Sequence, residues 1–261
     1  MTGNDLKWAR LEAAKRRLIY TLDLLNLPYG TAAEGFTPPL SFDFKGDELP
    51  NSGQWRSMGE AEQVFTGHAE GKITINIKEA DHVEREQLRE QLGESQRTII
   101  GHFRHEIGHY FWDLLVKGDK EPASIELFGD HNNPTYQEAL ERHYNEGPPP
   151  DWQEQYVSAY ATMHPWEDFA ETFALYLDMA SVLDTAGNAG FLHETAPLDD
   201  FEGIVSDFQR VGLVMNEMTR EMGLVDYTPE VLVEPVLRKL EFIHDLTGEA
   251  GNLRGSRPVP K

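Results

Sequence analysis

Hydrophobic residues recur at helical spacing over long stretches of the chain. Between residues 83 and 116 they follow one another mostly at steps of three and four, which places them on one helix face. They are Leu88, Leu92, Ile99, Ile100, Phe103, Ile107, Phe111 and Leu114. Similar patterns predict helices over residues 5–25, 135–145, 152–162, 199–222 and 229–246. Pro165 suits the first turn of a further helix in the stretch HPWEDFAETFALYLDM.

Two short segments alternate between apolar and polar residues instead. One contains Phe42 and Phe44, and the other, GKITINIKEAD, contains Ile73, Ile75 and Ile77. Alternation with a period of two predicts strands with one face on a core. The expected fold is therefore α+β, mostly α, with a small sheet early in the chain. We expect an N-terminal helix in residues 1–29, one catalytic domain over 30–247 and a disordered tail over 248–261.

The net charge of the chain limits the classes of partner that it is expected to bind. Forty-five acidic residues against 23 basic ones give a formal charge of −22. Such a surface repels phosphate backbones and anionic lipid, so neither nucleic acid nor a membrane is expected as a partner. No apolar run approaches the roughly 20 residues that span a bilayer. The N-terminal segment also lacks the apolar stretch and cleavage site of a signal peptide, and these features predict a cytoplasmic protein.

The chain contains no cysteine, which removes disulfides and thiolate metal sites, so any metal must be bound by His, Asp or Glu. The stretch HEIGH, residues 105–109, has the H-E-x-x-H pattern. Residues four apart share one face of a helix, so His105 and His109 can both reach one Zn²⁺ at about 2.0–2.1 Å. Glu106 is offset beside them, where a general base can take a proton from a zinc-activated water. A pattern with three fixed residues also arises by chance, which leaves a metal-free reading open.

A catalytic zinc site needs a third protein ligand and an open position. The motif is not followed by x-x-G-x-x-H, so a third histidine close behind it is excluded. Glu167 and Glu171 are four apart on the next candidate helix, beside an apolar stripe, where two carboxylates would repel each other without a nearby cation. We assign Glu167 as the third ligand and Glu171 as the acceptor that orients a ligand imidazole. Alternatively, both carboxylates face water.

These segments carry a family resemblance. The motif on one helix, with a glutamate from a downstream E-x-x-x-[DE] helix, resembles the gluzincin type of zincin metallopeptidase. More closely, GHFRHEIGHYFW and HPWEDFAETFALYLDM resemble the putative zinc-binding metallopeptidases of bacteria. Members often carry a zinc ribbon, which a chain without cysteine lacks. The resemblance implies a zincin-like domain with an active-site helix and a helical C-terminal part. It also implies His105, His109 and Glu167 as zinc ligands and Glu106 as general base.

The resemblance suggests further roles around the metal. A sheet-edge strand of zincins pairs with an extended peptide, so GKITINIKEAD is a candidate for this strand, or else an ordinary strand. Peptide hydrolysis needs a donor for the developing oxyanion. His164 ranks first because it begins the helix of Glu167, and the other candidates are Tyr160, His143 and Tyr144. His102 is expected to pack beside the ligands rather than to bind metal.

Three functional hypotheses are compatible with these motifs. We expect a zinc metallopeptidase, a hydrolase that acts on a peptide or protein substrate with Zn²⁺ as cofactor. The first alternative is a catalytically silent binding protein on a zincin scaffold, which captures a peptide or protein partner. The presence of Glu106 argues against it, because a pure binder needs no base there. The second alternative is a metal-free helical protein with a fortuitous motif.

Overall fold

The computed structural model describes residues 4–46, 66–81, 85 and 98–255. The described residues form seven α-helices and one three-stranded sheet, which confirms a mostly helical α+β fold. Contacts between Cα atoms divide the chain into two compact units. The first comprises residues 1–19 and 29–110, and the second comprises residues 20–28 and 111–261. The predicted limits of a single domain over 30–247 stay predictions.

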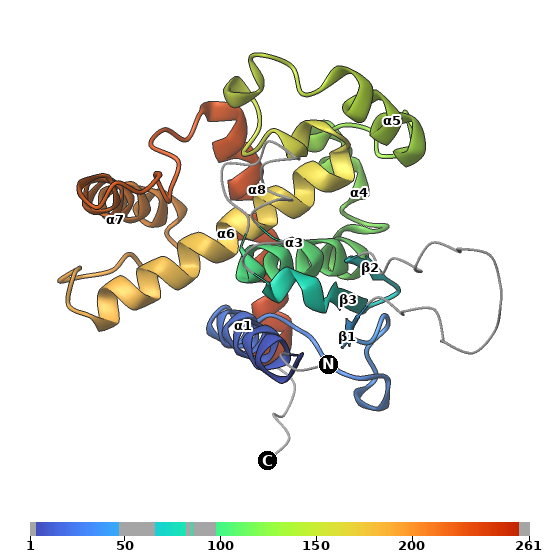
Figure 1. Ribbon diagram of the computed structural model, residues 1–261, viewed down its shortest axis with the longest axis horizontal. Coiled ribbons are helices and arrows are strands. Elements are labelled where there is room, and N and C mark those ends of the chain that lie inside the picture. The colour runs from blue at the N-terminus through green and yellow to red at the C-terminus, as the bar shows by residue number, and fades with distance from the viewer. Residues whose placement is uncertain (1–3, 47–65, 82–84, 86–97, 256–261) are drawn as a thin grey trace. The chain divides into compact units, whose positions relative to one another are not determined.

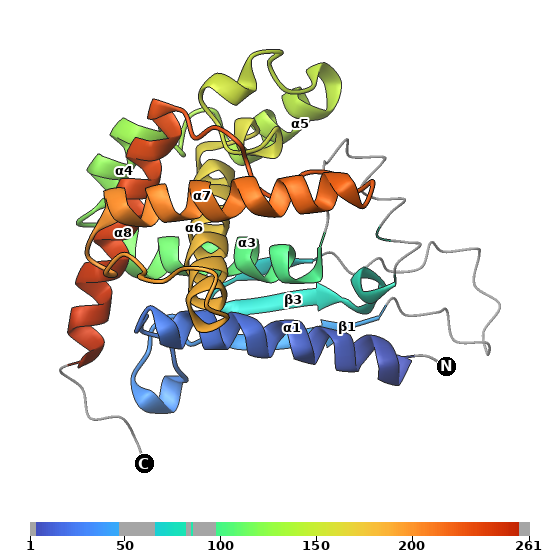
Figure 2. The same ribbon diagram turned by 90° about the vertical axis from the view of Figure 1, so that its left-hand side faces the viewer.

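The first unit contains the sheet. Its elements are most of α1 (Asn4–Leu24), β1 (Ser41–Lys45), β2 (Gly67–Ala69), β3 (Lys72–Asn76) and most of α3 (Ile99–Phe111). The strand order is β1-β3-β2, with β1 parallel and β2 antiparallel to β3. Figure 2 shows the strands running between α3 and α1. The apolar side chains of the sheet therefore have α3 to pack against, as the ring contacts of Phe103 show.

The alternating residues of the strands hold α3 in place. Phe42 and Phe44 stand in register with Ile73 and Ile75, both completely buried. The ring of Phe103, on α3, lies 5.9 Å from that of Phe42 and 6.0 Å from that of Phe44, measured between ring centroids. Aromatic pairs at this spacing add to the hydrophobic contribution of burial. One face of α3 is thus fixed on the sheet, and the orientation of its other faces follows.

Of the two readings of GKITINIKEAD, the structure supports an ordinary strand and not a sheet edge. β3 is the central strand, paired with β1 on one side and with β2 on the other, and beyond β2 the Asn76 N–H donates to Thr66 Oγ1 at 3.1 Å. Glu70 and Gly71, with φ of 49° and 81°, fold β2 back against β3 in a tight hairpin turn. Strand alternation reports a half-buried face and cannot tell a central strand from an edge. The strand is also shorter than predicted, because Ile77 begins a 3₁₀ turn (Ile77–Ala80).

The helix predicted over residues 83–116 is found in its C-terminal part. α3 spans Ile99–Phe111 and continues as a π-helical turn over Trp112–Val116. Residues 83–97, apart from Arg85, lie outside the described residues. The H-E-x-x-H motif is therefore in the middle of a regular helix, as predicted.

The second unit is built on one long helix. Its main elements are α4 (Glu121–Phe128), α5 (Tyr136–Glu146), α6 (Pro165–Asn188), α7 (Phe201–Glu221) and α8 (Glu234–Gly255). α4, α7 and α8 all contact α6, and Figure 1 shows α8 crossing it. Phe173 of α6 stacks on Phe111 at 5.2 Å and on Phe169 at 5.9 Å between centroids. This buried aromatic row fixes the first half of α6.

Three features of this unit differ from the sequence prediction. Residues 152–162 form two separate 3₁₀ turns, Trp152–Glu154 and Tyr160–Thr162, in place of one helix. α4, which has a proline in its first turn, lies in a stretch for which the pattern of apolar residues predicts no helix. α8 continues to Gly255, so residues 248–255 are helical and not a disordered tail, while 256–261 lie outside the described residues. Tertiary contact explains the extension, because Asn26 Nδ2 donates to the carbonyl of the buried Gly251.

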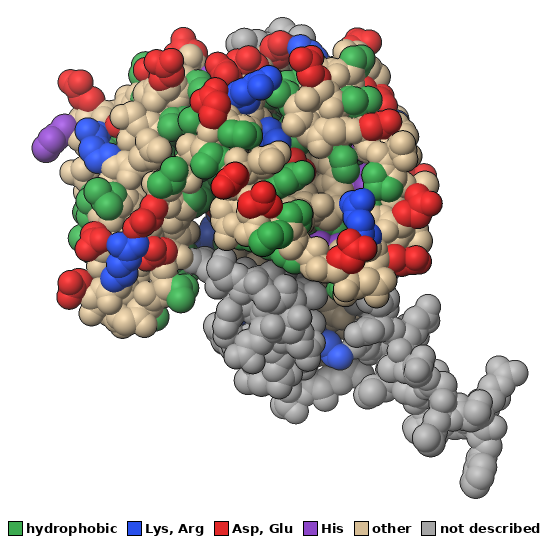
Figure 3. All heavy atoms as spheres, turned by 90° about the horizontal axis from the view of Figure 1, so that it is seen from above, with side chains coloured by type: hydrophobic (Ala, Val, Ile, Leu, Met, Phe, Trp, Pro, Cys, Tyr) green, Lys and Arg blue, Asp and Glu red, His purple; other side chains and the backbone are tan. Residues whose placement is uncertain are grey.

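Acidic side chains are spread over the face seen in Figure 3, among hydrophobic and fewer basic ones. This distribution matches the formal charge of −22. Within the described ranges, none of the helices has the length and apolar character that crossing a membrane requires. The cytoplasmic location stays a prediction.

Candidate metal centre

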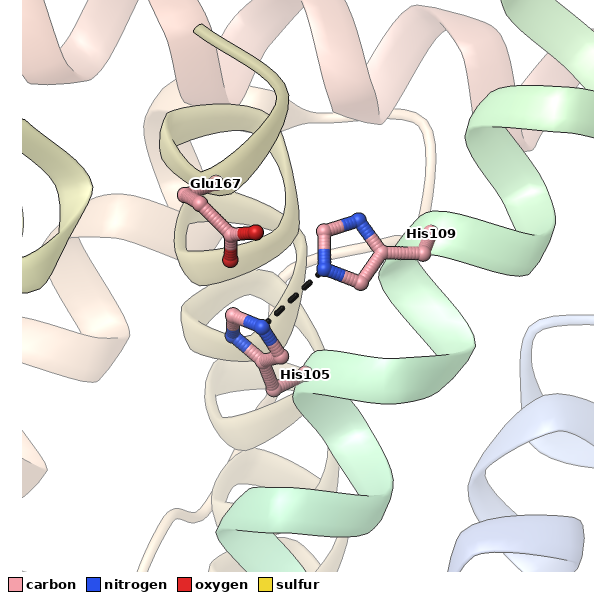
Figure 4. A group of neighbouring side chains, drawn as sticks. All are labelled: His105, His109 and Glu167. Atoms are coloured by element: carbon pink, nitrogen blue, oxygen red, sulfur yellow. Dashed lines mark hydrogen bonds between the residues drawn. The ribbon is translucent and has the colours of Figure 1, made fainter. Parts of the chain in front are cut away.

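Two histidines of α3 direct the same ring nitrogen toward each other. The Nε2 atoms of His105 and His109 lie 3.1 Å apart, and the rings stand nearly perpendicular at 86° (Figure 4). Residues four apart in a helix share a face, which accounts for the proximity. Two imidazole nitrogens that converge in this way can share either one proton or one cation. His109 is only 3% exposed, whereas His105 is half-buried, so the pair has one member that solvent reaches.

Buried residues on the other faces of α3 hold this geometry. Phe103 and Ile107 are completely buried, and Tyr110 donates its hydroxyl to the Pro38 carbonyl at 3.3 Å. Glu106 follows His105 by about 100° around the helix and is 8% exposed. The helix therefore presents two imidazoles and a neighbouring, largely buried carboxylate.

A second buried carboxylate comes from the first turn of α6. His164 caps this helix, because its Nδ1 accepts the Trp166 N–H at 3.2 Å, and Pro165 occupies the first position. Glu167 follows in the first turn and is 2% exposed. The positive end of the helix dipole stabilises a carboxylate there. The cap and the proline thus fix both the start of α6 and the place of Glu167.

His105, His109 and Glu167 form one candidate group (Figure 4). Each offers one ligand atom, and these atoms lie within 4.8 Å of one another. Two imidazole nitrogens and one carboxylate oxygen are a common protein ligand set for catalytic zinc. The group could therefore hold a metal ion. It contains the three residues that the sequence singled out as ligands, although their roles stay predictions.

Glu171 has a contact of its own. Its Oε2 accepts the hydroxyl of Ser158 at 2.7 Å, and the same Ser158 oxygen accepts the Ala161 N–H at 3.1 Å. The carboxylate thereby ties α6 to the 3₁₀ turn that precedes it. Its predicted role in orienting a ligand imidazole stays a prediction.

The candidate oxyanion donors occupy different settings. His164 uses Nδ1 as a helix cap, and burial lowers its pKa. For Tyr160, burial and then the charge of Glu167 raise the pKa of the phenol. His143 and Tyr144 lie on α5, and Tyr144 is 67% exposed. The charge of Glu167 acts to raise the pKa of both Tyr160 and His164, and the choice between these two candidates stays open.

His102 fits the packing role expected of it. Its Nδ1 lies 3.3 Å from Oε2 of Glu79, which is 5% exposed. This contact joins α3 to the 3₁₀ turn that follows β3. The residue supports the position of α3 in the first unit.

Sequence reasoning missed Tyr136. Its hydroxyl donates to Oε1 of Glu167 at 2.9 Å, across 31 positions of the chain. The sequence marks the start of α5 through Thr135 and Glu138, a capping box. No local pattern reports where the hydroxyl of Tyr136 points, because that depends on how α5 packs against the start of α6.

Comparison with known proteins identifies the family. Residues 4–246 match the family described as "putative zinc-binding metallo-peptidase", which confirms the resemblance seen in the motifs. Uncharacterised proteins of Mycobacterium bovis and of two Mycobacterium tuberculosis strains, CDC 1551 and H37Rv, are each 41% identical to the chain over 259 residues. Each match covers 95% of this chain and 72% of the relative. No solved structure matches the chain. The chain belongs to the family of putative zinc-binding metallopeptidases.

Proposed function

We propose that this protein is a zinc-dependent peptidase of the zincin type, in which His105, His109 and Glu167 hold Zn²⁺ and Glu106 is the general base. The observation that carries the proposal is the convergence of two Nε2 atoms, 3.1 Å apart, in a group with a buried carboxylate. Three ligands of this kind suit a catalytic zinc better than a structural one, because a catalytic site keeps a fourth position for water or substrate. The family match supports the same reading.

The proposed chemistry divides between the metal and the chain. When bound, Zn²⁺ polarises the scissile carbonyl and makes water acidic enough to attack near neutral pH. Glu106 accepts the proton of the attacking water on its carboxylate and later delivers it to the amine that leaves. Its position next to His105 in α3 keeps the base beside the ligands, and its burial limits competing contact with bulk water. The proposed substrate is a peptide or a protein.

The first test is metal content. Protein purified without a histidine tag should contain about one zinc per chain, and chelation followed by zinc should restore it. Absence of bound zinc, together with no thermal shift on adding zinc, would support the metal-free alternative and contradict this proposal.

The second test separates binding from hydrolysis. Glu106→Gln should keep zinc and lose cleavage of a broad peptide library, because the amide cannot accept the proton. Glu146→Gln, a change of the same kind at an exposed position on α5, is the matched control and should keep both. Stoichiometric zinc in the wild-type protein with no hydrolysis of any peptide would favour the silent binding protein.

A further inference from the structure

Tyr136 connects the beginnings of two helices through one hydroxyl group. Tyr136 is the first residue of α5, and its hydroxyl donates to Oε1 of Glu167 in the first turn of α6, with 2.9 Å between the oxygens. Glu167 is 2% exposed, whereas Tyr136 is 38% exposed. A hydrogen bond to a charged acceptor with a buried partner contributes more than an ordinary surface contact.

The backbone of Tyr136 is held by the cap of α5. Thr135 Oγ1 accepts the Glu138 N–H at 3.4 Å, and Glu138 Oε2 accepts the Thr135 N–H at 3.0 Å. This reciprocal pair fixes the first helical turn. The position from which the Tyr136 side chain leaves the backbone is therefore set locally.

The ring of Tyr136 is held by residues around the start of α6. It meets the rings of His164 and Trp166 edge-on, at centroid distances of 5.3 and 6.1 Å. His164 and Trp166 also bond to each other at the helix cap. The ring and the carboxylate acceptor are thus placed by the same helix start, so packing and hydrogen bonding can be separated by removing only the hydroxyl.

A hydrogen-bond donor in a fixed position can order a metal-binding carboxylate before the metal arrives. Glu167 has two equivalent oxygens and several rotatable bonds, and ordering such a side chain costs conformational entropy. Donation to Oε1 fixes the plane of the carboxylate and favours metal binding through the other oxygen. Tyr160 is part of the same cluster, because a hydrogen bond with Tyr136 contributes to the raised pKa of its phenol after burial and the charge of Glu167.

We propose that Tyr136 is a positioning residue for the metal site, which orders the Glu167 carboxylate before the metal binds. This inference rests on the proposed function, since it takes Glu167 as a zinc ligand. Tyr136 acts through Glu167, and its role in the site is measured by the affinity for zinc.

The test removes the hydroxyl and keeps the ring. In Tyr136→Phe, the affinity for zinc, measured by competition with a chromophoric chelator, should fall by about 10–100-fold, the usual effect of losing a partner of a metal ligand. Tyr227→Phe makes the same change at an exposed tyrosine with no proposed role in the site and should leave the affinity unchanged. The metal-free Tyr136→Phe protein should still unfold cooperatively, with a modestly lower melting temperature, because a buried carboxylate loses one donor.

A double-mutant cycle tests whether Tyr136 affects zinc affinity through Glu167. In a Glu167→Ala background, where His105 and His109 remain, Tyr136→Phe should cause no further loss of zinc affinity. Wild-type affinity in Tyr136→Phe, or an equal loss in the Glu167→Ala background, would overturn the inference. If zinc binds the wild-type protein and is lost in His105→Ala, such a result overturns this inference alone. If the wild-type protein binds no zinc, the proposed function falls as well.

Discussion

The Nζ atom of Lys239 lies 2.6 Å from Oδ2 of Asp168, and the two side chains are only 7% and 1% exposed. Lys239 also donates to the carbonyl of Gln155 at 2.9 Å and lies over the ring of Tyr156. Burial raises the pKa of Asp168 to about 7, against the opposing effect of the Lys239 charge. Desolvation thus outweighs attraction, and the pair joins α8 to the residue that follows Glu167 in α6.

Removing one partner of this ion pair should be strongly destabilising. Lys239→Ala should lower the free energy of unfolding by about 3–5 kcal/mol, because a buried carboxylate loses its partner. Lys120→Ala is the control, since Lys120 and Glu249 form an exposed pair at 2.8 Å whose loss should cost less than about 1 kcal/mol. Urea unfolding measures both. Equal losses in the two variants would mean that burial does not set the strength of the pair.

The three proposed ligands and Glu171 should differ in how far their loss weakens zinc binding. His105→Ala, His109→Ala and Glu167→Ala should each abolish tight zinc binding, because each removes one of three ligands. Glu171→Ala should weaken binding by about 10–100-fold, as expected of a residue that acts on a ligand. Isothermal titration with zinc distinguishes them. If Glu171→Ala abolished binding and Glu167→Ala preserved it, the two assignments would have to be exchanged.

The hairpin between β2 and β3 should tolerate only glycine at Gly71. Its φ is 81°, and a Cβ atom there would lie 2.2 Å from the Pro39 carbonyl oxygen. Gly71→Ala should therefore lower the free energy of unfolding by more than about 2 kcal/mol, since the left-handed conformation alone costs about 1–2 kcal/mol for a residue with a Cβ. Glu70→Asn is the matched change one position earlier, where φ is 49°. It should be neutral or stabilising in the same unfolding experiment, because Asn-Gly suits this turn, and a loss there would contradict the turn assignment.

Acid should destabilise the first unit through His68. Its Nε2 accepts the Gly71 N–H at 3.0 Å, and burial, followed by the charge of His109, lowers its pKa to about 4. The unfolded residue titrates near about 6.5, so between these values the unfolded chain binds the extra proton. The free energy of unfolding must then fall as the pH drops from about 6.5 to about 4.

The pH dependence can be assigned to His68 by substitution. His68→Gln keeps an oxygen that can accept the Gly71 N–H but does not titrate, so metal-free protein should show a shallower decline in urea unfolding over this range. His193→Gln changes an exposed histidine and should leave the decline as it is. An unchanged slope in His68→Gln would show that other groups cause the acid sensitivity.

Local patterns predicted the parts of the site that a single helix determines. His105 and His109 face each other because residues four apart lie on one helix face, whatever the rest of the chain does. The alternation of Phe42, Phe44, Ile73 and Ile75 likewise marked the strands whose apolar face receives α3. The start of α6 was also visible, because proline at the first position is favourable in any helix.

The tertiary structure decided what local patterns leave open. The sequence places β3 in a sheet, but β3 is the central strand only because β1 pairs with one of its edges and β2 with the other. The end of α8 is extended by contact with Asn26, 225 positions away, where the local composition indicated a tail. Tyr136 meets Glu167 because two helix starts pack together. Periodicity reports which side of a segment is buried, whereas the partner that buries it depends on contacts between distant segments, which no short window of sequence contains.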